Sequence, residues 1–258
     1  MRLLDAQIGK FIMAKTLILI PSRMSASRLP GKPLLKINNL SMISHVFKKA
    51  EETKIGEVVV ATEDKEILDD VEKNGGKAIL TCSTHKTGTD RIFEAYEKLN
   101  IKDIDFILNL QGDEPNIDKN DIINLNNFMI NSNSGIGTLA AEIKNDKMLI
   151  DQNIVKVITE TKLEKNNFPI ALNFTRDGFS RNDQNTYHHI GIYSYKTSTL
   201  KKFVSLDQTS SEKQNKLEQL RALDNNLKIS VALANFSPIG VDTKEDYLAI
   251  KKIMEYKL

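Results

Sequence analysis

The sequence lacks the features that mark several classes of protein. A single cysteine, Cys82, excludes an internal disulfide and fits a reducing cytoplasm. No apolar run approaches the roughly 20 residues that a membrane-spanning helix needs. The net charge of +2 gives no basic excess for nucleic acid, and no acidic block indicates a disordered tail. We therefore expect a cytoplasmic protein whose partners include neither nucleic acid nor a membrane.

Two common nucleotide-binding motifs are also missing. No Gly-x-Gly-x-x-Gly follows the first apolar run, which argues against an NAD-dependent oxidoreductase. The same region lacks the Gly-x-x-x-x-Gly-Lys-Ser/Thr spacing of a P-loop. The chain also contains no internal repeat and no low-complexity linker, so we predict one main domain.

The first half of the sequence does contain a regular alternation of short apolar runs and helical spacing. Strands are predicted at 16–20, 57–61, 77–81 and 105–110, and helices at 42–52, 64–74 and 89–99. Such alternation is typical of βαβ units. It predicts a doubly wound α/β fold of Rossmann-like type with a mostly parallel sheet.

The second half is less regular. Strands are predicted at 136–143, 155–159, 190–195 and 228–234, and helices at 212–223 and 243–256. We predict that residues 15–258 form a single domain, with a smaller mixed-strand insertion at about 135–200. Residues 1–14 have little apolar periodicity and are predicted to be a disordered or mis-assigned extension, with full activity retained in a chain that starts at Met13.

Polar segments follow the predicted strands at one edge of the sheet, where ligands bind in this fold class. The first, 21–33, contains Arg23, Arg28 and Lys32. Three cations on one loop suit a triphosphate, because they neutralise its charge and donate hydrogen bonds to its oxygens. A solvated basic loop is the alternative. Segments 82–91, 111–115 and 240–243 should lie at the same edge.

Two of these segments carry acids. Asp113, in Gln111-Gly-Asp-Glu-Pro115, follows a strand and is a natural ligand for the Mg²⁺ of a nucleotide, although Gly, Asp and Pro also favour turns. Asp242 precedes the last helix and is compatible with a simple helix cap. Two unpaired carboxylates would repel an anionic ligand, so we predict that both acids hold one Mg²⁺.

The remaining candidates are open to two interpretations each. Backbone N–H groups at the helix start in 85–91 could face a phosphate, and Thr89 could equally be an N-cap. Glu218 and Arg221 are one helical turn apart and could pair on the surface, whereas Glu218 and Gln219 could bind sugar hydroxyls. We expect Cys82 to be a core residue rather than a catalyst.

Together these segments resemble the CMP-Kdo synthetase family, the 3-deoxy-manno-octulosonate cytidylyltransferases, from about Lys15 to the C-terminus. The motifs that carry the resemblance are Arg23-x-x-x-x-Arg28-Leu-Pro-Gly-Lys32, Thr87-Gly-Thr-Asp-Arg91, Gln111-Gly-Asp-Glu-Pro115, Asn153-Ile-Val-Lys-Val157, His189-Ile-Gly-Ile-Tyr193, Leu217-Glu-Gln-Leu-Arg221 and Val241-Asp-Thr243.

The resemblance implies an enzyme that transfers CMP from CTP to the anomeric hydroxyl of the acidic sugar Kdo, releases pyrophosphate and activates Kdo for lipopolysaccharide synthesis. It also implies a Mg²⁺ cofactor and a homodimer, with the insertion serving sugar binding and dimerisation. The implied site residues are Arg23, Arg28, Lys32, Gly88, Thr89 and Arg91 for CTP, Asp113 and Asp242 for Mg²⁺, and Gln111, Arg176, His189, Glu218 and Gln219 for the sugar; Arg23, Lys32, Asp113 and Asp242 would be catalytic.

Two segments on the sugar side depart from the family pattern. Asn173-Phe-Thr-Arg-Asp-Gly178 stands where members often have Tyr-Phe-Ser-Arg-Ala and a following Ile-Pro, and Thr209-Ser-Ser-Glu212 lacks a proline. A related acid sugar, such as 8-amino-Kdo or a sialic acid, is therefore an alternative acceptor. A non-catalytic nucleotide-binding relative is harder to reconcile with the presence of both acids and all three cations.

Overall fold

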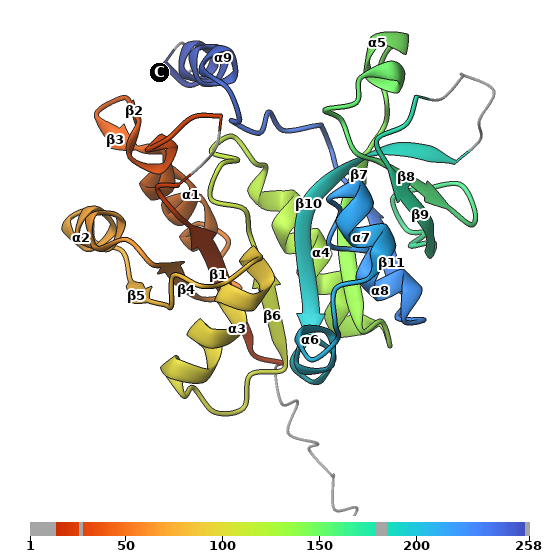
Figure 1. Ribbon diagram of the computed structural model, residues 1–258, viewed down its shortest axis with the longest axis horizontal. Coiled ribbons are helices and arrows are strands. Elements are labelled where there is room, and N and C mark those ends of the chain that lie inside the picture. The colour runs from red at the N-terminus through yellow and green to blue at the C-terminus, as the bar shows by residue number, and fades with distance from the viewer. Residues whose placement is uncertain (1–13, 26–27, 179–184, 256–258) are drawn as a thin grey trace, which may run out of the picture.

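One nine-stranded sheet organises residues 14–25, 28–178 and 185–255, the part of the chain that the computed structural model describes (Figure 1). The strands are β1 (Thr16–Ser22), β4 (Gly56–Thr62), β5 (Ala78–Leu80), β6 (Phe106–Asn109), β7 (Ile136–Ala141), β8 (Lys156–Thr159), β9 (Ala171–Thr175), β10 (Thr186–Lys196) and β11 (Ile229–Leu233), with β2 (Lys36–Ile37) and β3 (Leu40–Ser41) in a separate hairpin. The helices are η1 (Lys32–Leu34), α1 (Met42–Glu51), α2 (Lys65–Lys73), α3 (Gly88–Leu99), α4 (Lys119–Asn131), α5 (Asp146–Ile150), α6 (Thr197–Val204), α7 (Ser210–Asn215), α8 (Leu220–Asp224) and α9 (Lys244–Glu255).

The main sheet has the strand order β11-β7-β10-β6-β1-β4-β5. All neighbouring pairs along it are parallel except those of β10, which runs antiparallel to both β6 and β7. The predicted mostly parallel α/β sheet is therefore confirmed. Strands β8 and β9 branch off this path through the pairing of β8 with β10.

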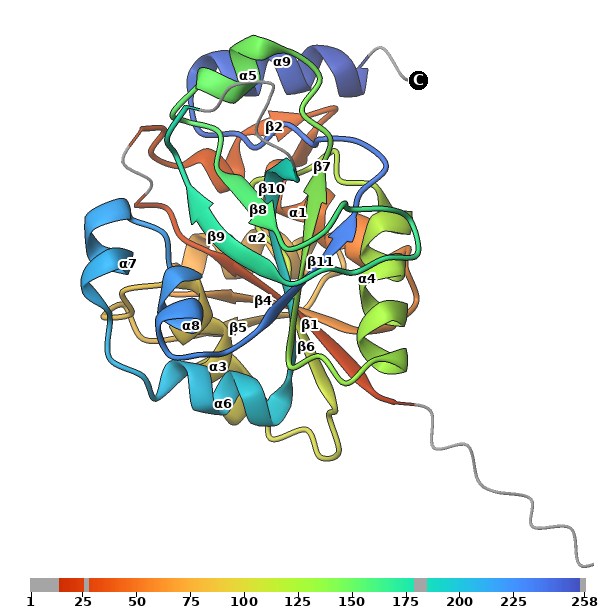
Figure 2. The same ribbon diagram turned by 90° about the vertical axis from the view of Figure 1, so that its right-hand side faces the viewer.

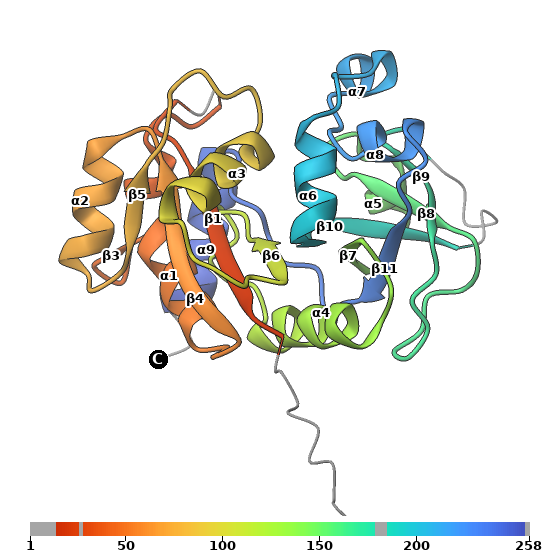
Figure 3. The same cartoon turned by 90° about the horizontal axis from the view of Figure 1, so that it is seen from below.

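Helices cover both faces of the sheet because its central strands are apolar on both sides. In β1, Leu17 and Leu19 pack in a cluster with α3 and α6, whereas Ile18 and Ile20 pack in a cluster with α1, α2 and α4. Figure 3 shows α3 and α6 on the opposite side of β1 from α1 and α4. A strand buried on both faces loses the alternation of apolar and polar residues, as the uninterrupted run in β1 indicates.

The prediction of one continuous helix at 212–223 was wrong. The chain instead forms α7 and α8, and Lys216 between them adopts a left-handed conformation with φ 53°. The break lets the Arg221 guanidinium reach back to the Glu212 carboxylate, with hydrogen bonds of 2.8 and 2.6 Å. A buried ion pair thus overrides the helical spacing of the sequence.

The pattern analysis also missed α4, α6 and β9. Helix α4 is rich in asparagine, which has a modest intrinsic helix propensity, and it is held by Ile122, Leu125 and Met129 packing on the sheet. Strands β7 and β10, inside the predicted insertion, are part of the main sheet path, and β8 and β9 lie beside it. The proposed domain boundaries stay a prediction. The extension at 1–14 lies outside the described residues except for Ala14.

Helix α9 ends the described chain and lies beside the β2–β3 hairpin (Figure 2), where its Ile250 joins an apolar cluster with Ile37 of β2, Met42 of α1 and Val241 of the preceding loop. None of the helices formed by residues 14–25, 28–178 and 185–255 combines the length and the apolar character required to cross a membrane.

Candidate active site

A cleft of about 350 Å³ opens at the carboxyl ends of β1 and β6. All four segments that the sequence analysis placed at this edge contribute to it. Among the predicted residues, its lining includes Arg23, Arg28, Lys32, Gly88, Arg91, Gln111, Asp113 and Asp242. The prediction that these distant segments meet is confirmed, although their binding roles stay predictions.

Two glycines let the loops of the cleft come together. Gly31 has φ 73°, a left-handed conformation that costs glycine little, and its N–H donates to the carbonyl of Met24 at 2.9 Å. This tight turn leads directly into η1 and Lys32. At Gly112 an added Cβ would lie 3.1 Å from the carbonyl oxygen of Pro21, which is tighter than most Cβ contacts, so a side chain here would press the loop after β6 away from the end of β1.

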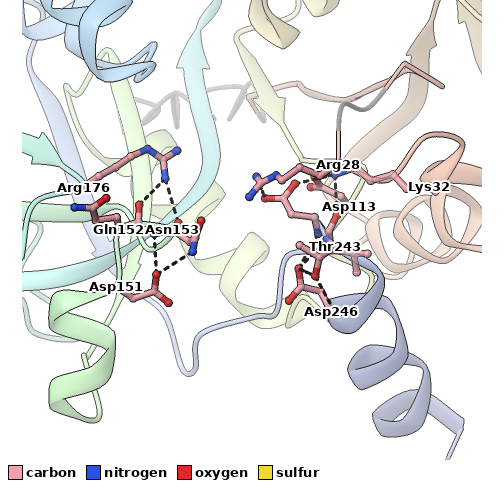
Figure 4. Close-up of polar contacts among 11 residues, drawn as sticks. Arg28, Lys32, Asp113, Asp151, Gln152, Asn153, Arg176, Thr243 and Asp246 are labelled. Carbon is pink, nitrogen blue, oxygen red and sulfur yellow. Dashed lines mark hydrogen bonds and ion pairs between the residues drawn. The ribbon is translucent and has the colours of Figure 1, made fainter.

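The Lys32 ammonium lies between the two predicted metal ligands. Its Nζ donates to Asp113 Oδ2 at 2.7 Å, to Asp242 Oδ1 at 3.1 Å and to the carbonyl oxygen of Val241 at 2.7 Å. Figure 4 shows this group together with Arg28, whose Nη2 donates to Asp242 Oδ2 at 2.6 Å. Burial alone would lower the pKa of Lys32, but the two carboxylates outweigh it and raise the pKa above its ordinary value.

Asp242 is not the N-cap of α9. Thr243 and Asp246 cap that helix reciprocally: Asp246 N–H donates to Thr243 Oγ1 at 3.2 Å, and Thr243 N–H donates to Asp246 Oδ2 at 2.9 Å. The N–H of Val241 donates to the carbonyl of Asp113 at 2.9 Å, which ties the two acidic segments together. The Asp242 carboxylate therefore does not cap the helix, and it contacts Lys32 and Arg28 of the cleft instead.

The carboxylates of the cleft are suitable ligands for the Mg²⁺ that accompanies a bound nucleotide. Two carboxylates that both contact one ammonium are close enough to serve one small cation, and Mg²⁺ commonly takes one or two carboxylates and completes its shell with phosphate and water. No three His, Cys, Asp or Glu side chains gather as a metal site within residues 14–25, 28–178 and 185–255. Glu114 adds no third charge, because burial and the neighbouring Asp113 raise its pKa to about 8.

The start of α3 forms a second wall of the cleft. Thr87, rather than Thr89, is the N-cap: its Oγ1 accepts from Asp90 N–H at 3.1 Å. Gly88 lines the cleft, whereas the Thr89 hydroxyl points to Glu218 and donates to its Oε2 at 3.0 Å. The interpretation of Thr89 as an N-cap was wrong.

Arg91 borders the cleft, but its guanidinium is buried and paired. It contacts Glu63, and its Nη1 donates to Thr81 Oγ1 at 2.7 Å. These contacts fix the end of β5 against α3. The pattern gave no sign of Glu63 as the partner, because the pair joins two separate βαβ units.

The residues expected on the sugar side do not gather in one place. Arg176 is not among the residues that line the cleft, and its Nη1 donates to the carbonyls of Gln152 and Asn153 at 3.2 and 3.1 Å (Figure 4). His189 is deeper, with Nε2 at 3.1 Å from Thr138 Oγ1 and its ring edge-on to Phe174.

Glu218 and Gln219 line a separate small cavity of about 40 Å³ beside Tyr193 and Tyr195. Burial raises the pKa of Glu218 to about 7, although donors such as the hydroxyls of Thr87 and Thr89 oppose the shift. Glu218 and Arg221 do pair, at 3.8 Å, but the prediction that they pair on the surface was wrong, because Arg221 is buried and its hydrogen bonds go to Glu212.

Several cleft residues were not predicted, and one residue of segment 82–91 was misplaced. His85 and Lys86 line the cleft, and the only signal for them was their place in segment 82–91. Cys82, expected in the core, is exposed, with Sγ at 3.0 Å from Thr84 Oγ1. It follows β5, an edge strand, so fewer neighbours cover it.

His189 should make the protein lose stability in acid. Burial lowers its pKa from 6.5 to about 3. As the pH falls through 6.5, His189 of the unfolded chain takes up a proton, whereas His189 of the folded protein takes one up only near pH 3. The free energy of unfolding is therefore unaffected by this group above pH 6.5 and decreases as the pH falls from 6.5 toward 3. Between about pH 7 and about pH 5, the wild type should lose more free energy of unfolding than His189→Gln in urea titrations. Equal slopes would contradict the assignment, since all other groups are shared by the two proteins.

Comparisons with known proteins agree with this geometry. The cytidylyltransferase family model matches residues 17–229. The 3-deoxy-manno-octulosonate cytidylyltransferase of Thermodesulfovibrio yellowstonii is 43% identical over 256 residues, covering 93% of this chain and 98% of its own. That of Bartonella henselae is 42% identical, covering 92% and 98%.

The solved structures show the same relationship in three dimensions. A CMP:2-keto-3-deoxy-manno-octonic acid synthetase complexed with CTP has a TM-score of 0.84 and 34% identity, covering 95% of this chain and 100% of that one. A 4-diphosphocytidyl-2C-methyl-D-erythritol synthase of Anaerococcus prevotii, at a TM-score of 0.63 and 13% identity over 94% and 99%, shares the fold alone. By sequence and by structure, the chain belongs to the 3-deoxy-manno-octulosonate cytidylyltransferase family.

Proposed function

We propose that this protein transfers the CMP group of CTP to the anomeric hydroxyl of Kdo. The observation that carries the proposal is the meeting of Arg23, Arg28 and Lys32 with Asp113 and Asp242 in one cleft. A cleft with three cations and two acids suits a nucleoside triphosphate with its metal. The motif order and the identity with curated family members support Kdo as the acceptor.

The reaction needs little covalent chemistry from the protein. The sugar oxygen forms a bond to the α-phosphorus, the bond from that phosphorus to the β-phosphate oxygen breaks, and the hydroxyl proton passes to water. Lys32, Arg23 and Arg28 would hold the phosphates in line and neutralise the charge that builds on the leaving pyrophosphate.

The metal proposal rests on the two acids of the cleft. Asp113 and Asp242 would hold Mg²⁺, which when bound lowers the pKa of the attacking hydroxyl and neutralises phosphate charge. The Gly112 turn and the hydrogen bond from Val241 N–H to the Asp113 carbonyl would hold the segments that carry Asp113 and Asp242 next to each other.

On the sugar side, Gln111 and Arg176 would contact the acidic sugar. Gln111 lines the cleft, and the Arg176 guanidinium would attract a sugar carboxylate. His189, Glu218 and Gln219 would orient the sugar from the deeper side, and Thr89 would support Glu218. Gly88 and the buried Arg91 would shape the nucleotide wall.

The family relationship also supports a homodimer working in the cytoplasm, with residues 15–258 as one domain. Light scattering coupled to size-exclusion chromatography should give twice the mass of the chain. A monomer that retains full turnover would refute the dimer as the working unit.

Pyrophosphate release should occur with CTP and Kdo and be much slower when ATP or GTP replaces CTP. We expect kcat/KM for CTP to exceed that for ATP by at least about a hundredfold. The site would form hydrogen bonds with the polar edge of cytosine, and a purine in its place would leave those protein groups without hydrogen-bond partners. The assay should be repeated with 8-amino-Kdo and a sialic acid. Faster turnover of either would reassign the acceptor, and no turnover with any sugar would refute the proposal.

A further inference from the structure

The Lys32 ammonium is fully engaged where a shared cation would lie. An ammonium has three N–H donors, and those of Lys32 are matched by Asp113 Oδ2, Asp242 Oδ1 and the carbonyl of Val241. The Lys32 side chain is only 13% exposed, so the ammonium is held in this position and is not free to move in solvent. The lysine that should contact phosphate is therefore already bound to the two acids.

The charges in this group already balance without a metal. Two carboxylates face two cations, since Arg28 also contacts Asp242, at 2.6 Å. A divalent cation that binds without a nucleotide would have to displace the Lys32 ammonium from these oxygens or bind next to its positive charge, and both are unfavourable. A triphosphate changes the balance, because its oxygens offer Lys32 and Arg28 other anionic partners.

We propose that Lys32 keeps the Asp113–Asp242 pair closed to free divalent cations until a triphosphate draws its ammonium away. Metal and nucleotide then bind together, and at every stage either the Lys32 ammonium or the metal ion lies between the Asp113 and Asp242 carboxylates. This inference rests on the proposed function for the identity of the triphosphate, but its central element, the occupation of the acids by Lys32, is independent of the acceptor sugar.

Mn²⁺ binding measured without any nucleotide or sugar tests the proposal. Titrations followed by electron paramagnetic resonance should show that Lys32→Met and Lys32→Gln bind Mn²⁺ at least about tenfold more tightly than the wild type, which corresponds to about 1.4 kcal/mol. Lys77→Met is the matched control: it removes a lysine paired with Glu57 at 2.7 Å on the surface and changes the net charge equally. It should bind Mn²⁺ as weakly as the wild type.

Two further variants locate the effect. Lys32→Arg keeps a positive charge and should leave Mn²⁺ binding weak, whereas adding Asp113→Asn and Asp242→Asn to Lys32→Met should abolish the gain. The proposal is overturned if the two neutral Lys32 variants, shown to be folded by circular dichroism, bind no more tightly than wild type. A gain that survives loss of both acids, or that Lys32→Arg shows equally, overturns it as well.

The result is separable from the proposed reaction. If Mn²⁺ binding tightens as expected but pyrophosphate release from CTP is absent with every sugar, the proposed function fails and the lysine's hold on the acids stands. If the wild type turns over CTP and Kdo but Mn²⁺ binding is unchanged in the neutral Lys32 variants, only this inference fails.

Discussion

Replacing either acid of the cleft, Asp113→Asn or Asp242→Asn, should lower kcat by at least about a hundredfold with the fold intact. Each substitution removes half of the negative charge that would hold a metal and, in the ligand-free protein, a partner of Lys32. Because the structure assigns the cap of α9 to Thr243 and Asp246, loss of the Asp242 carboxylate should not unravel that helix. Steady-state pyrophosphate release and urea unfolding measure the two effects separately.

The double variant distinguishes a shared site from two independent ones. If both carboxylates serve one ion, the second substitution should add little to the first, since either alone disables the site. Asp69→Asn is the control, because Asp69 pairs with Lys65 at 2.8 Å on an exposed helix face and is not part of the cleft lining. Near-normal turnover in either single variant would leave the shared-metal mechanism without support.

Glu212→Gln should destabilise the protein by about 3–5 kcal/mol, the cost typical of leaving one member of a buried ion pair alone. Arg221 and Glu212 side chains are 2% and 4% exposed, and two hydrogen bonds join them. Gln keeps the size of the side chain but not its charge, so the Arg221 guanidinium would stay buried without its hydrogen-bonded carboxylate, and Glu218 lies farther away, at 3.8 Å.

Urea unfolding at neutral pH measures this loss, with Glu212→Gln/Arg221→Met as the second variant. Removing both charges should recover part of the stability, since no uncompensated ion remains. The pKa of Glu212 is lowered, because hydrogen bonds from Arg221 outweigh burial; its stabilisation is therefore present above the unfolded pKa and lost as the pH falls through the folded one. A loss no larger than that for Asp69→Asn would show that the pair contributes nothing.

The order of strands and helices in the first half could be predicted because each element there is coded locally. Thr16–Ser22 and Gly56–Thr62 are apolar runs that only a doubly covered strand can bury, and the Gly75-Gly76 pair ends the helix between two strands. Parallel strands also share an edge by necessity, so the convergence of 21–33, 82–91, 111–115 and 240–243 followed from topology alone. The family motifs then added chemical roles that spacing cannot supply.

What the sequence determined by itself was therefore the class of fold, the edge that carries the site and the residues gathered there. The tertiary structure decided the pairings: Lys32 between Asp113 and Asp242, Arg91 on Glu63, and Arg221 on Glu212 across a broken helix. These contacts join residues far apart in the chain or across a left-handed turn. Local propensity carries no information about them, because a charge's partner is set by which side chains the packed sheet and helices bring within a few ångströms.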